Sequence, residues 1–426
     1  MNAASKLRDA LARIVSDEPR WLAAFARMIA AETSFPPGAG YEAFADLMEA
    51  IFAPLGFGFR RVEVPAALWG GAETQAHGAR INLIAARRTG KPVCSIYFHV
   101  DTVPPGAGWT HPPFELTRDG DRLYGRGTAD MKGTIAATLV ALLAADAAGV
   151  ALAYDPVLLF CTDEEGGLYP GVRFLAEQRL IEGHVLCLNG GAAPRIWAGC
   201  FGSLDLAIRV QGRAAHSGEA TGGINAVEES LPILAALMDL KRRVETRSSA
   251  LPPPPHLEGR KLTARLNVTG IQGGAKGSAL PGACTIIVNR RYPPEEEFTA
   301  VRAELEATIR AAAQDTRALG LELNLVGHLA PVADPDAGPY WPRWCDAVAF
   351  GFGHPRDGFR RWGASSSSDM GFVQQAGIAN ILLGGLSRPE RNVHAANEYT
   401  TVADVTALAR ALLVYLADSV PGGDPA

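Results

Sequence analysis

The chain has 426 residues, of which 48% are hydrophobic, 20% charged and 8% aromatic. This length predicts two or three domains, because single hydrophobic cores stop growing at about 250–300 residues. The apolar content excludes a disordered or fibrous protein. The 40 Lys and Arg residues against 45 Asp and Glu residues give a net charge of −5. That balance argues against a dedicated nucleic-acid-binding protein, which needs a basic face.

Neither a disulfide framework nor a membrane anchor is expected. The six cysteines form no CxxC pair and lie mostly within apolar runs, as buried free thiols do. Residues 1–21 are amphipathic and lack the apolar core of a signal peptide. The longest uncharged apolar stretch, Gly133 to Ala145, is shorter than the roughly 20 residues that span a bilayer. We therefore expect a soluble, cytoplasmic protein without a membrane partner.

Helices begin the predicted fold, and strands and helices then alternate. Helical spacing of apolar residues predicts helices over residues 1–30 and 41–52. An Ala- and Leu-rich helix is predicted from Thr134 to Ala148. Apolar runs predict buried strands at Val93–His99, Val157–Cys161, His184–Leu188 and Asn380–Leu383. This alternation predicts a largely parallel sheet that is covered on both faces, so the fold class is α/β.

From about Ser203 the pattern changes to the order strand-helix-strand-strand-helix-strand, which is that of a ferredoxin-like domain. The expected elements cover 204–210, 225–244, 262–268, 284–292, 294–318 and 321–326. This domain interrupts the α/β domain, which resumes near Pro331. We therefore predict a catalytic metal-binding domain over 1–202 and 329–426, with an inserted lid and dimerisation domain over 203–328.

Polar residues cluster at the carboxyl ends of the predicted strands, where an open α/β sheet places its ligand crevice. The cluster contains His99, Asp101, Asp130, Asp163, Glu164, Glu165, Asn189 and His394. Two histidines and several carboxylates in one crevice suit a divalent metal such as Zn or Mn. Each residue alone has a simpler explanation, such as a core histidine, a helix cap or a solvated turn. Adjacent acids directly after an apolar strand fit those explanations poorly, because an unpaired buried charge is expensive.

The cluster belongs to a longer series of ordered motifs. The series is HVDTVP from His99, Trp109, Pro113-Phe114, LYGRGTADMKG from Leu123, DEEGG from Asp163, AHS from Ala215, RRYPP from Arg290, Ser368-Asp369 and HAANE from His394. In these motifs and their order the sequence resembles the dinuclear-zinc aminoacylase and carboxypeptidase family. That family includes acetylornithine deacetylase, succinyl-diaminopimelate desuccinylase and glutamate carboxypeptidase. The resemblance covers nearly the whole chain and implies a zinc-peptidase-like α/β/α sandwich with an inserted ferredoxin-like α+β lid.

The resemblance also implies a set of metal ligands. One metal would be held by His99, Asp130 and a further acidic residue. The second would be held by Asp130, Glu165 and His394, so that Asp130 bridges the two ions. The cofactor would be Zn or Mn, at one or two ions per chain.

Four further residues take roles from the same resemblance. Asp101 would hold the ring of His99 by a hydrogen bond. Glu164 would be the general base that takes a proton from a metal-bound water and later passes it to the leaving nitrogen. His216 would reach the site of a partner subunit in a lid-mediated homodimer and stabilise the oxyanion. Arg291 would lie near the substrate carboxylate, although a structural ion pair explains an arginine there equally well.

One position departs from the family pattern. The remaining acidic ligand is expected about two dozen residues after Glu165, and residue 189 is Asn. The segment between Gly183 and Leu204 contains no Asp or Glu, so a shift of register does not restore the acid. With only Asp130 and Glu165 as anionic ligands, two divalent ions would leave a site charge of +2 instead of +1. We therefore expect one tight metal site, with Asn189 as a doubtful ligand.

Three functions remain open from the sequence. The first is a metal-dependent hydrolase that cleaves the amide of an N-acyl amino acid or dipeptide bearing a carboxylate. The second, suggested by the altered ligand set, is a hydrolytic deaminase of an aromatic amine, of the nitroanthranilate aminohydrolase type. The third is a non-catalytic relative that binds small molecules. The retention of Glu164 beside a complete second set of ligands argues against the third.

Overall fold

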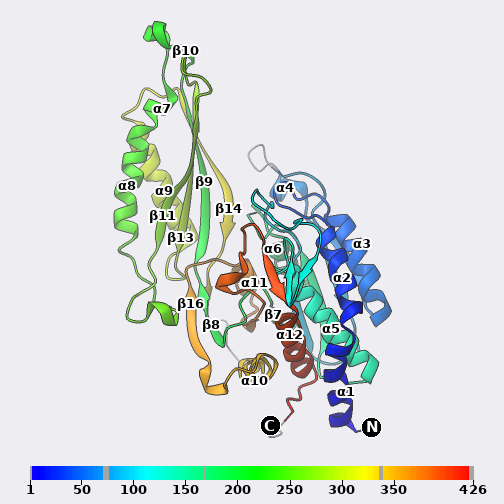
Figure 1. Cartoon of the computed structure of the whole chain (residues 1–426). Helices are drawn as coiled ribbons and strands as arrows, with labels where there is room; N and C mark the ends of the chain where they lie inside the picture. The colour runs from blue at the N-terminus through cyan, green and yellow to red at the C-terminus, as the bar shows by residue number, and fades with distance from the viewer. Residues whose placement is uncertain (1, 71–75, 167, 335–338, 422–426) are drawn as a thin grey trace. The chain divides into compact units, whose positions relative to one another are not determined.

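The computed structural model describes residues 2–70, 76–166, 168–334 and 339–421 (Figure 1). Two compact units make up the chain. Unit 1 contains Met1–Trp197, Asp334–Arg361 and Phe372–Ala426, and unit 2 contains Ala198–Ala333 and Trp362–Gly371. The second unit thus takes in a short segment, 362–371, from the last third of the chain.

Unit 1 is built on a six-stranded sheet with the order β1-β2-β6-β3-β7-β17. Its strands are β1 (Gly58–Glu63), β2 (Ile81–Ala86), β3 (Val93–His99), β6 (Asp155–Cys161), β7 (His184–Cys187) and β17 (Ile381–Leu383). The pairs β6–β3, β3–β7 and β7–β17 are parallel, whereas β1–β2 and β2–β6 are antiparallel. The predicted parallel core is confirmed, and the two antiparallel strands at one edge are additions that the sequence did not indicate.

The central strands are apolar along their whole length because both faces of the sheet are covered. All seven residues of β6 are buried, and so are all residues of β3 except Val93. Successive side chains of a strand point to opposite faces, so continuous burial requires packing on both sides. The rings of Phe98 and Phe160, on neighbouring strands, stack with their centroids 5.4 Å apart.

Helices of unit 1 pack around α5 and against the sheet. The elements are α1 (Ala3–Ser16), α2 (Glu18–Ala30), α3 (Tyr41–Phe52), α4 (Ala66–Trp69), α5 (Lys132–Ala148), α6 (Gly171–Glu177), α10 (Tyr340–Phe352) and α12 (Val402–Leu416). Helix α5 packs against α1, α2, α12 and β3, which explains why it is apolar on almost every side. Its second residue, Gly133, must lack a Cβ, which would lie 2.1 Å from the Thr128 carbonyl oxygen.

Short elements complete the connections. They are β4 (Thr117–Asp119), β5 (Arg122–Tyr124), β18 (Tyr399–Thr401), β8 (Arg195–Cys200), β15 (Val332–Ala333), β16 (Arg360–Ala364), α11 (Met370–Gln375), η1 (Ala53–Leu55), η3 (Pro255–Leu257), η4 (Arg356–Gly358) and η5 (Pro389–Arg391). Strands β18, β5 and β4 form a small sheet that pairs the chain after His394 with the chain before Asp130.

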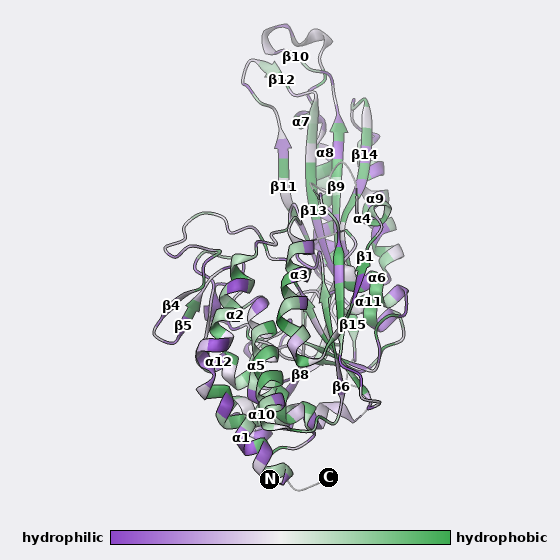
Figure 2. Cartoon of the chain, turned by 90° about the vertical axis from the view of Figure 1, so that its right-hand side faces the viewer, coloured by the Kyte–Doolittle hydropathy of each residue, from purple (hydrophilic) through white to green (hydrophobic). Residues whose placement is uncertain are grey.

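Unit 2 has the predicted ferredoxin-like order. Its sheet runs β11-β13-β9-β14, with β9 (Gly202–Gln211), β11 (Arg265–Gly273), β13 (Ala283–Tyr292) and β14 (Gly320–Leu329). The helices are α7 (Ala226–Glu229), α8 (Leu231–Val244) and α9 (Phe298–Ala313), and β10 (Ala215–His216), η2 (Ser217–Gly222) and β12 (Ala279–Leu280) form an excursion. Apolar side chains of β9, β13, α8 and α9 share one core, and Figure 2 shows hydrophobic residues along these strands.

Several predicted boundaries in unit 2 were wrong. The helix expected over 225–244 is divided at Ser230 into α7 and α8, and Pro232 occupies the first turn of α8. Proline has no backbone N–H to continue the preceding helix, but it is tolerated in a first turn. The helix expected over 294–318 covers only Phe298–Ala313, and the strand expected over 262–268 begins at Arg265 and extends to Gly273.

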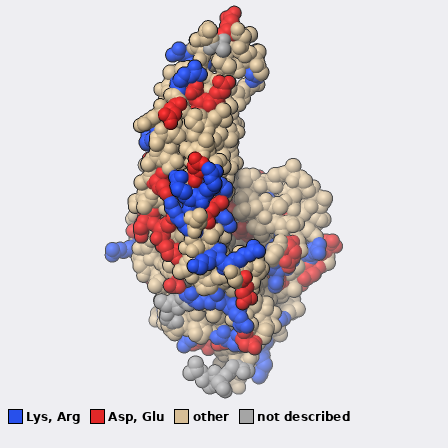
Figure 3. Space-filling view, turned by 90° about the vertical axis from the view of Figure 1, so that its left-hand side faces the viewer, with Lys and Arg blue, Asp and Glu red and all other residues tan. Residues whose placement is uncertain are grey.

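Charged side chains of both signs are interspersed on the face drawn in Figure 3. Arg247, for example, contacts Glu296 and Glu304 within unit 2. Among the residues that the structure describes, no helix combines the length and apolar character needed to cross a bilayer. The cytoplasmic location expected from the sequence stays a prediction.

Candidate metal centre

The strand register of unit 1 brings the predicted polar residues to one edge of the sheet. His99, the last residue of β3, pairs with Cys161, the last residue of β6. The turn that contains Glu164 and Glu165 therefore starts beside the segment that contains Asp101. Tyr97 pairs with Cys187 on β7, so Asn189 follows at the level of His99. The Cα register alone thus predicts that these side chains meet.

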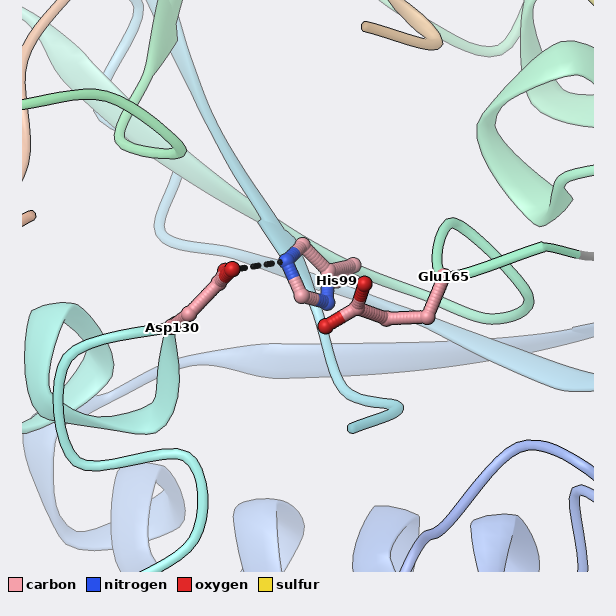
Figure 4. Close-up of side chains that lie close together, drawn as sticks. All are labelled: His99, Asp130 and Glu165. Atoms are coloured by element: carbon pink, nitrogen blue, oxygen red, sulfur yellow. Dashed lines mark hydrogen bonds and ion pairs between the residues drawn. The ribbon is translucent and has the colours of Figure 1, made fainter. Parts of the chain in front are cut away.

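Three side chains meet at this edge, as Figure 4 shows. The ligand atoms of His99, Asp130 and Glu165 all lie within 4.8 Å of one another. His99 Nε2 is 2.9 Å from Asp130 Oδ1. His394 joins from the opposite end of the chain, with Nε2 3.0 Å from Glu165 Oε2 and 3.3 Å from Asp130 Oδ2. The four residues that the resemblance named as ligands therefore lie together, with both histidines in contact with Asp130.

The carboxylates of Asp130 and Glu165 favour the protonated forms of the two histidines beside them. Hydrogen bonds to Asp130 and Glu165 raise the pKa of His394 to about 10. Burial opposes protonation of His99, yet the hydrogen bond to Asp130 raises the pKa of that ring well above its usual range. Burial and then the charge of Asp130 raise the pKa of Glu165 to about 7. Neighbouring groups with pKa values shifted this strongly are typical of functional sites.

Asp101 holds the site differently from the expectation. The His99 Nδ1 atom lies 3.0 Å from the backbone carbonyl oxygen of Asp101, whereas it is 3.7 Å from the carboxylate oxygen Oδ1. The ring is therefore oriented by the main chain. The other carboxylate oxygen, Oδ2, accepts a hydrogen bond of 2.8 Å from the backbone N–H of Glu165. Asp101, which is fully buried, thus fixes the turn that carries Glu165.

A buried ion pair anchors the start of the same turn. Asp163 accepts hydrogen bonds from Arg80 Nε at 2.8 Å and from the Tyr41 hydroxyl at 2.7 Å. Arg80 also lies over the Trp69 ring, 4.0 Å from its centroid. Asp163 adopts a left-handed conformation with φ = 61°, which is uncommon for a residue with a Cβ. These contacts hold the turn in that conformation. The sequence carries no local signal that identifies Arg80, Tyr41 or Trp69 as its supports.

Asn189 contacts the expected general base. Its Nδ2 atom donates a hydrogen bond of 3.1 Å to Glu164 Oε1, and both residues are half-buried. An aspartate here would place a second negative charge against the Glu164 carboxylate, whereas the amide stabilises the charged form of the base. Asn189 therefore has a partner of its own in the site, and its role as a metal ligand stays a prediction.

Other predicted residues lie elsewhere in the fold. His216 and Arg291 belong to unit 2, where His216 is exposed on β10. Arg291 donates from Nη1 to Ser367 Oγ at 2.7 Å and from Nε to Asn289 Oδ1 at 3.2 Å. His184 begins β7, at the opposite end of the strand from Asn189, and its Nε2 atom lies 2.7 Å from the Tyr415 hydroxyl. Gly167 of the DEEGG motif lies outside the described residues.

The donor set fits a divalent cation. Two imidazoles and two carboxylates are ligands that Zn²⁺ and Mn²⁺ both accept. Asp130 is 16% exposed and Glu165 is 5% exposed, so their negative charges are costly without a positive partner. His99, Asp130, Glu165 and His394 would hold the ion.

Comparisons with known proteins identify related sequences and related folds. The model of peptidase family M20/M25/M40 matches residues 95–418. A succinyl-diaminopimelate desuccinylase of Xanthomonas oryzae pv. oryzae (strain MAFF 311018) is 30% identical over 339 residues, covering 77% of this chain and 84% of the relative. The dipeptidase Dug1p of Saccharomyces cerevisiae superposes with a TM-score of 0.79 at 16% identity over 97% of this chain and 99% of its own. Human carnosine dipeptidase 1 gives 0.75 at 17% identity, over 97% and 100%.

We predict that dialysis without chelator leaves one divalent ion per chain. Two close divalent ions depend on anionic ligands, and position 189 supplies none. Metal analysis of the dialysed protein tests this expectation. Asn189→Asp should then raise the occupancy of a second position, because it restores one negative charge. Retention of two equivalents by the unaltered protein would contradict the prediction.

Proposed function

The chain belongs to peptidase family M20/M25/M40, and we propose that it hydrolyses the amide bond of a small N-acyl amino acid or dipeptide that carries a carboxylate. Membership of the family makes the protein a metal-dependent hydrolase that acts on amide C–N bonds. The substrate, the identity of the metal and the roles of single residues belong to the proposal.

One observation carries the mechanism: Glu164 directly precedes the proposed ligand Glu165, and its carboxylate accepts a hydrogen bond from Asn189. The ligand atoms of His99, Asp130 and Glu165 converge, and Glu164 precedes Glu165 on the same anchored turn. Adjacent residues of this turn point their carboxylates to different partners, Glu165 to His394 and Glu164 to Asn189. These separate partners support Glu165 as the ligand and Glu164 as the base.

Glu164 would act first as base and then as acid. As a carboxylate it would accept a proton from the water that attacks the amide carbon. As a carboxylic acid it would return that proton to the amide nitrogen, so that the C–N bond breaks to give a carboxylate and an amine. When bound, a divalent metal supplies Lewis acidity, which polarises the amide carbonyl and lowers the pKa of a coordinated water to about 7. The hydrogen bond from Asn189 would keep Glu164 charged and oriented before the reaction.

Recognition of the substrate is assigned by resemblance and supported by charge. Arg291 is half-buried in unit 2, and its guanidinium is oriented by Asn289 and Ser367. A guanidinium held in this way suits a carboxylate, which it can bind with two parallel hydrogen bonds. The 30% identical relative is named a succinyl-diaminopimelate desuccinylase, so N-succinyl amino acids are the first compounds to test.

A screen for released amine tests the proposed reaction. We expect the Zn- or Mn-loaded protein to release a primary amine from an N-acyl amino acid or a dipeptide. Aminobenzoates should give no ammonia, because the proposed reaction breaks an amide C–N bond and leaves the bond between nitrogen and an aromatic ring intact. Release from aminobenzoates alone would support the aromatic deaminase instead. Binding without any turnover across the panel would support the non-catalytic alternative.

We predict that Glu164→Gln lowers kcat by roughly 10²–10⁴-fold, because an amide cannot accept the proton from water. Its oxygen can still accept the hydrogen bond from Asn189, so metal content and fold should persist. Steady-state kinetics and metal analysis measure both effects. Glu182→Gln is a suitable control, since Glu182 is a surface glutamate that pairs with Arg88. A Glu164→Gln variant with near wild-type kcat would remove Glu164 from the role of base.

We also propose a homodimer formed through unit 2. Strand β11 is at one edge of the sheet, where its outer backbone groups are available for another strand. Ile271 on β11 is 55% exposed, and Leu231 at the start of α8 is 58% exposed. Pairing of β11 with a second copy would place Ile271 within the new interface.

We expect sedimentation to give twice the mass of the chain at working concentration. His216→Ala should lower kcat by about 10²–10³-fold, as loss of an oxyanion donor does in other enzymes. His256→Ala provides the control, because His256 is an exposed histidine of the same unit. A fully active monomer, or unchanged kcat in His216→Ala, would argue against the partner role.

A further inference from the structure

Glu398 ends the HAANE motif, and the reaction described above gives it no role. Its side chain is 1% exposed and accepts four hydrogen bonds. Oε1 accepts from the backbone N–H of Ala129 at 2.8 Å and of Asp130 at 3.0 Å. Oε2 accepts from the backbone N–H of Gly127 at 3.1 Å and from Arg126 Nη1 at 2.6 Å. Four donors therefore converge on one buried carboxylate.

The backbone N–H groups that donate to Glu398 belong to an irregular segment of the chain. Residues 125–131 connect β5 to α5 and belong to neither a helix nor a strand. Gly127 has φ = 87°, a left-handed conformation, and its N–H donates to the same carboxylate as the N–H groups of Ala129 and Asp130. Backbone N–H groups that converge in this way form a concave site for an anion. Glu398 supplies that anion, and the last donor is the N–H of the metal ligand Asp130 itself.

The segment that carries Glu398 also carries His394. Arg126 Nη2 donates to the Ala395 carbonyl oxygen at 3.2 Å, in addition to its bond with Glu398. Asn397 Oδ1 accepts from the backbone N–H of Thr110 at 2.9 Å. The backbone carbonyl of Glu398 accepts from Gly125 N–H at 3.0 Å. Hydrogen bonds thus join residues 394–398 to Thr110 and to the segment that precedes Asp130.

We propose that Glu398 is a positioning residue that locks the Asp130-bearing segment to the His394-bearing segment and thereby fixes two metal ligands relative to each other. The inference rests on the proposed metal centre and deepens it. Asp130 and His394 are 264 residues apart in the sequence. A carboxylate with both oxygens in use can hold two such segments in one geometry, whereas a single backbone contact leaves them free to shift.

Glu398→Gln tests the inference with a minimal change of shape. Glutamine keeps one oxygen but replaces the other by an NH₂ group, which faces donors that have lost their acceptor. It also removes the negative charge that pairs with buried Arg126. We expect the dissociation constant of Zn²⁺, measured by competition with a chromogenic chelator, to rise about 10–100-fold, as it does when other supporting contacts of metal ligands are lost.

The kinetic pattern separates positioning from contact with the substrate. With Zn²⁺ added above its new dissociation constant, most of kcat should return and KM should stay near the wild-type value. A residue that only stabilises the fold would lower the unfolding midpoint without changing the Zn²⁺ affinity of the folded protein. Both quantities are therefore measured on the same preparations.

Asp155→Asn is a matched control. Asp155 is 2% exposed at the start of β6 and accepts bonds from the backbone N–H groups of Thr89, Gly90 and Lys91. It also accepts from the Thr89 hydroxyl at 2.6 Å. The same type of buried anion site thus exists at the strand end opposite Cys161, which leads to the metal centre. Asp155→Asn should lower stability and leave Zn²⁺ affinity unchanged.

Each outcome decides between the alternatives. Zn²⁺ affinity in Glu398→Gln within about threefold of the wild-type value would overturn the inference while leaving the metal centre intact. A wild-type chain that binds no Zn²⁺ would overturn the proposed function, and with it the inference. If Glu398→Gln does not fold, Glu398→Asp replaces it, because it keeps the charge and withdraws the carboxylate by one methylene. Unchanged Zn²⁺ affinity in that folded variant would equally overturn the inference.

Discussion

The candidate site depends on one carboxylate, Asp130, that stands between two histidines. His99 reaches it from the end of β3, and His394 reaches it from a segment near the C-terminus. Hydrogen bonds from both rings hold the pKa of Asp130 well below its usual range, although burial alone would raise it. Three parts of the surrounding structure position these side chains. Strand β3 fixes His99, and the turn after β6 presents Glu165. Glu398 accepts a hydrogen bond from the backbone N–H of Asp130. A divalent cation is the partner that such a concentration of negative charge requires.

Much of this could be read from the sequence because the relevant signals are local. Apolar runs located β3, β6 and β7, and polar residues directly after those runs located His99, Glu165 and Asn189. The parallel register then places these residues at one sheet edge without any further information. The ferredoxin-like order was predictable for the same reason, since alternation in β9 and β13 and helical spacing in α8 and α9 repeat over short distances. Resemblance of the motifs added what spacing cannot supply, namely an expectation of which residue is a ligand and which is a base.

The remaining features depend on contacts between distant residues, for which the sequence has no local signal. Nothing near Arg80 indicates that it pairs with Asp163, 83 residues later, and nothing near Glu398 indicates that it accepts the N–H of Asp130. The ring of His99 is oriented by a main-chain carbonyl, which any residue at position 101 would supply. Asn189 shows the same limit. The sequence reveals the missing charge, but only the structure shows that the amide donates to Glu164.

We propose that His99, Asp130, Glu165 and His394 hold a catalytic metal. Anomalous diffraction from crystals of the Zn-loaded protein tests this proposal most directly. Data collected on both sides of the zinc absorption edge locate the ion without reference to activity. We expect one strong peak per chain among the ligand atoms of His99, Asp130, Glu165 and His394, with the Glu164 carboxylate beside it. Absence of a peak there after loading, or zinc bound to other residues, would contradict this assignment.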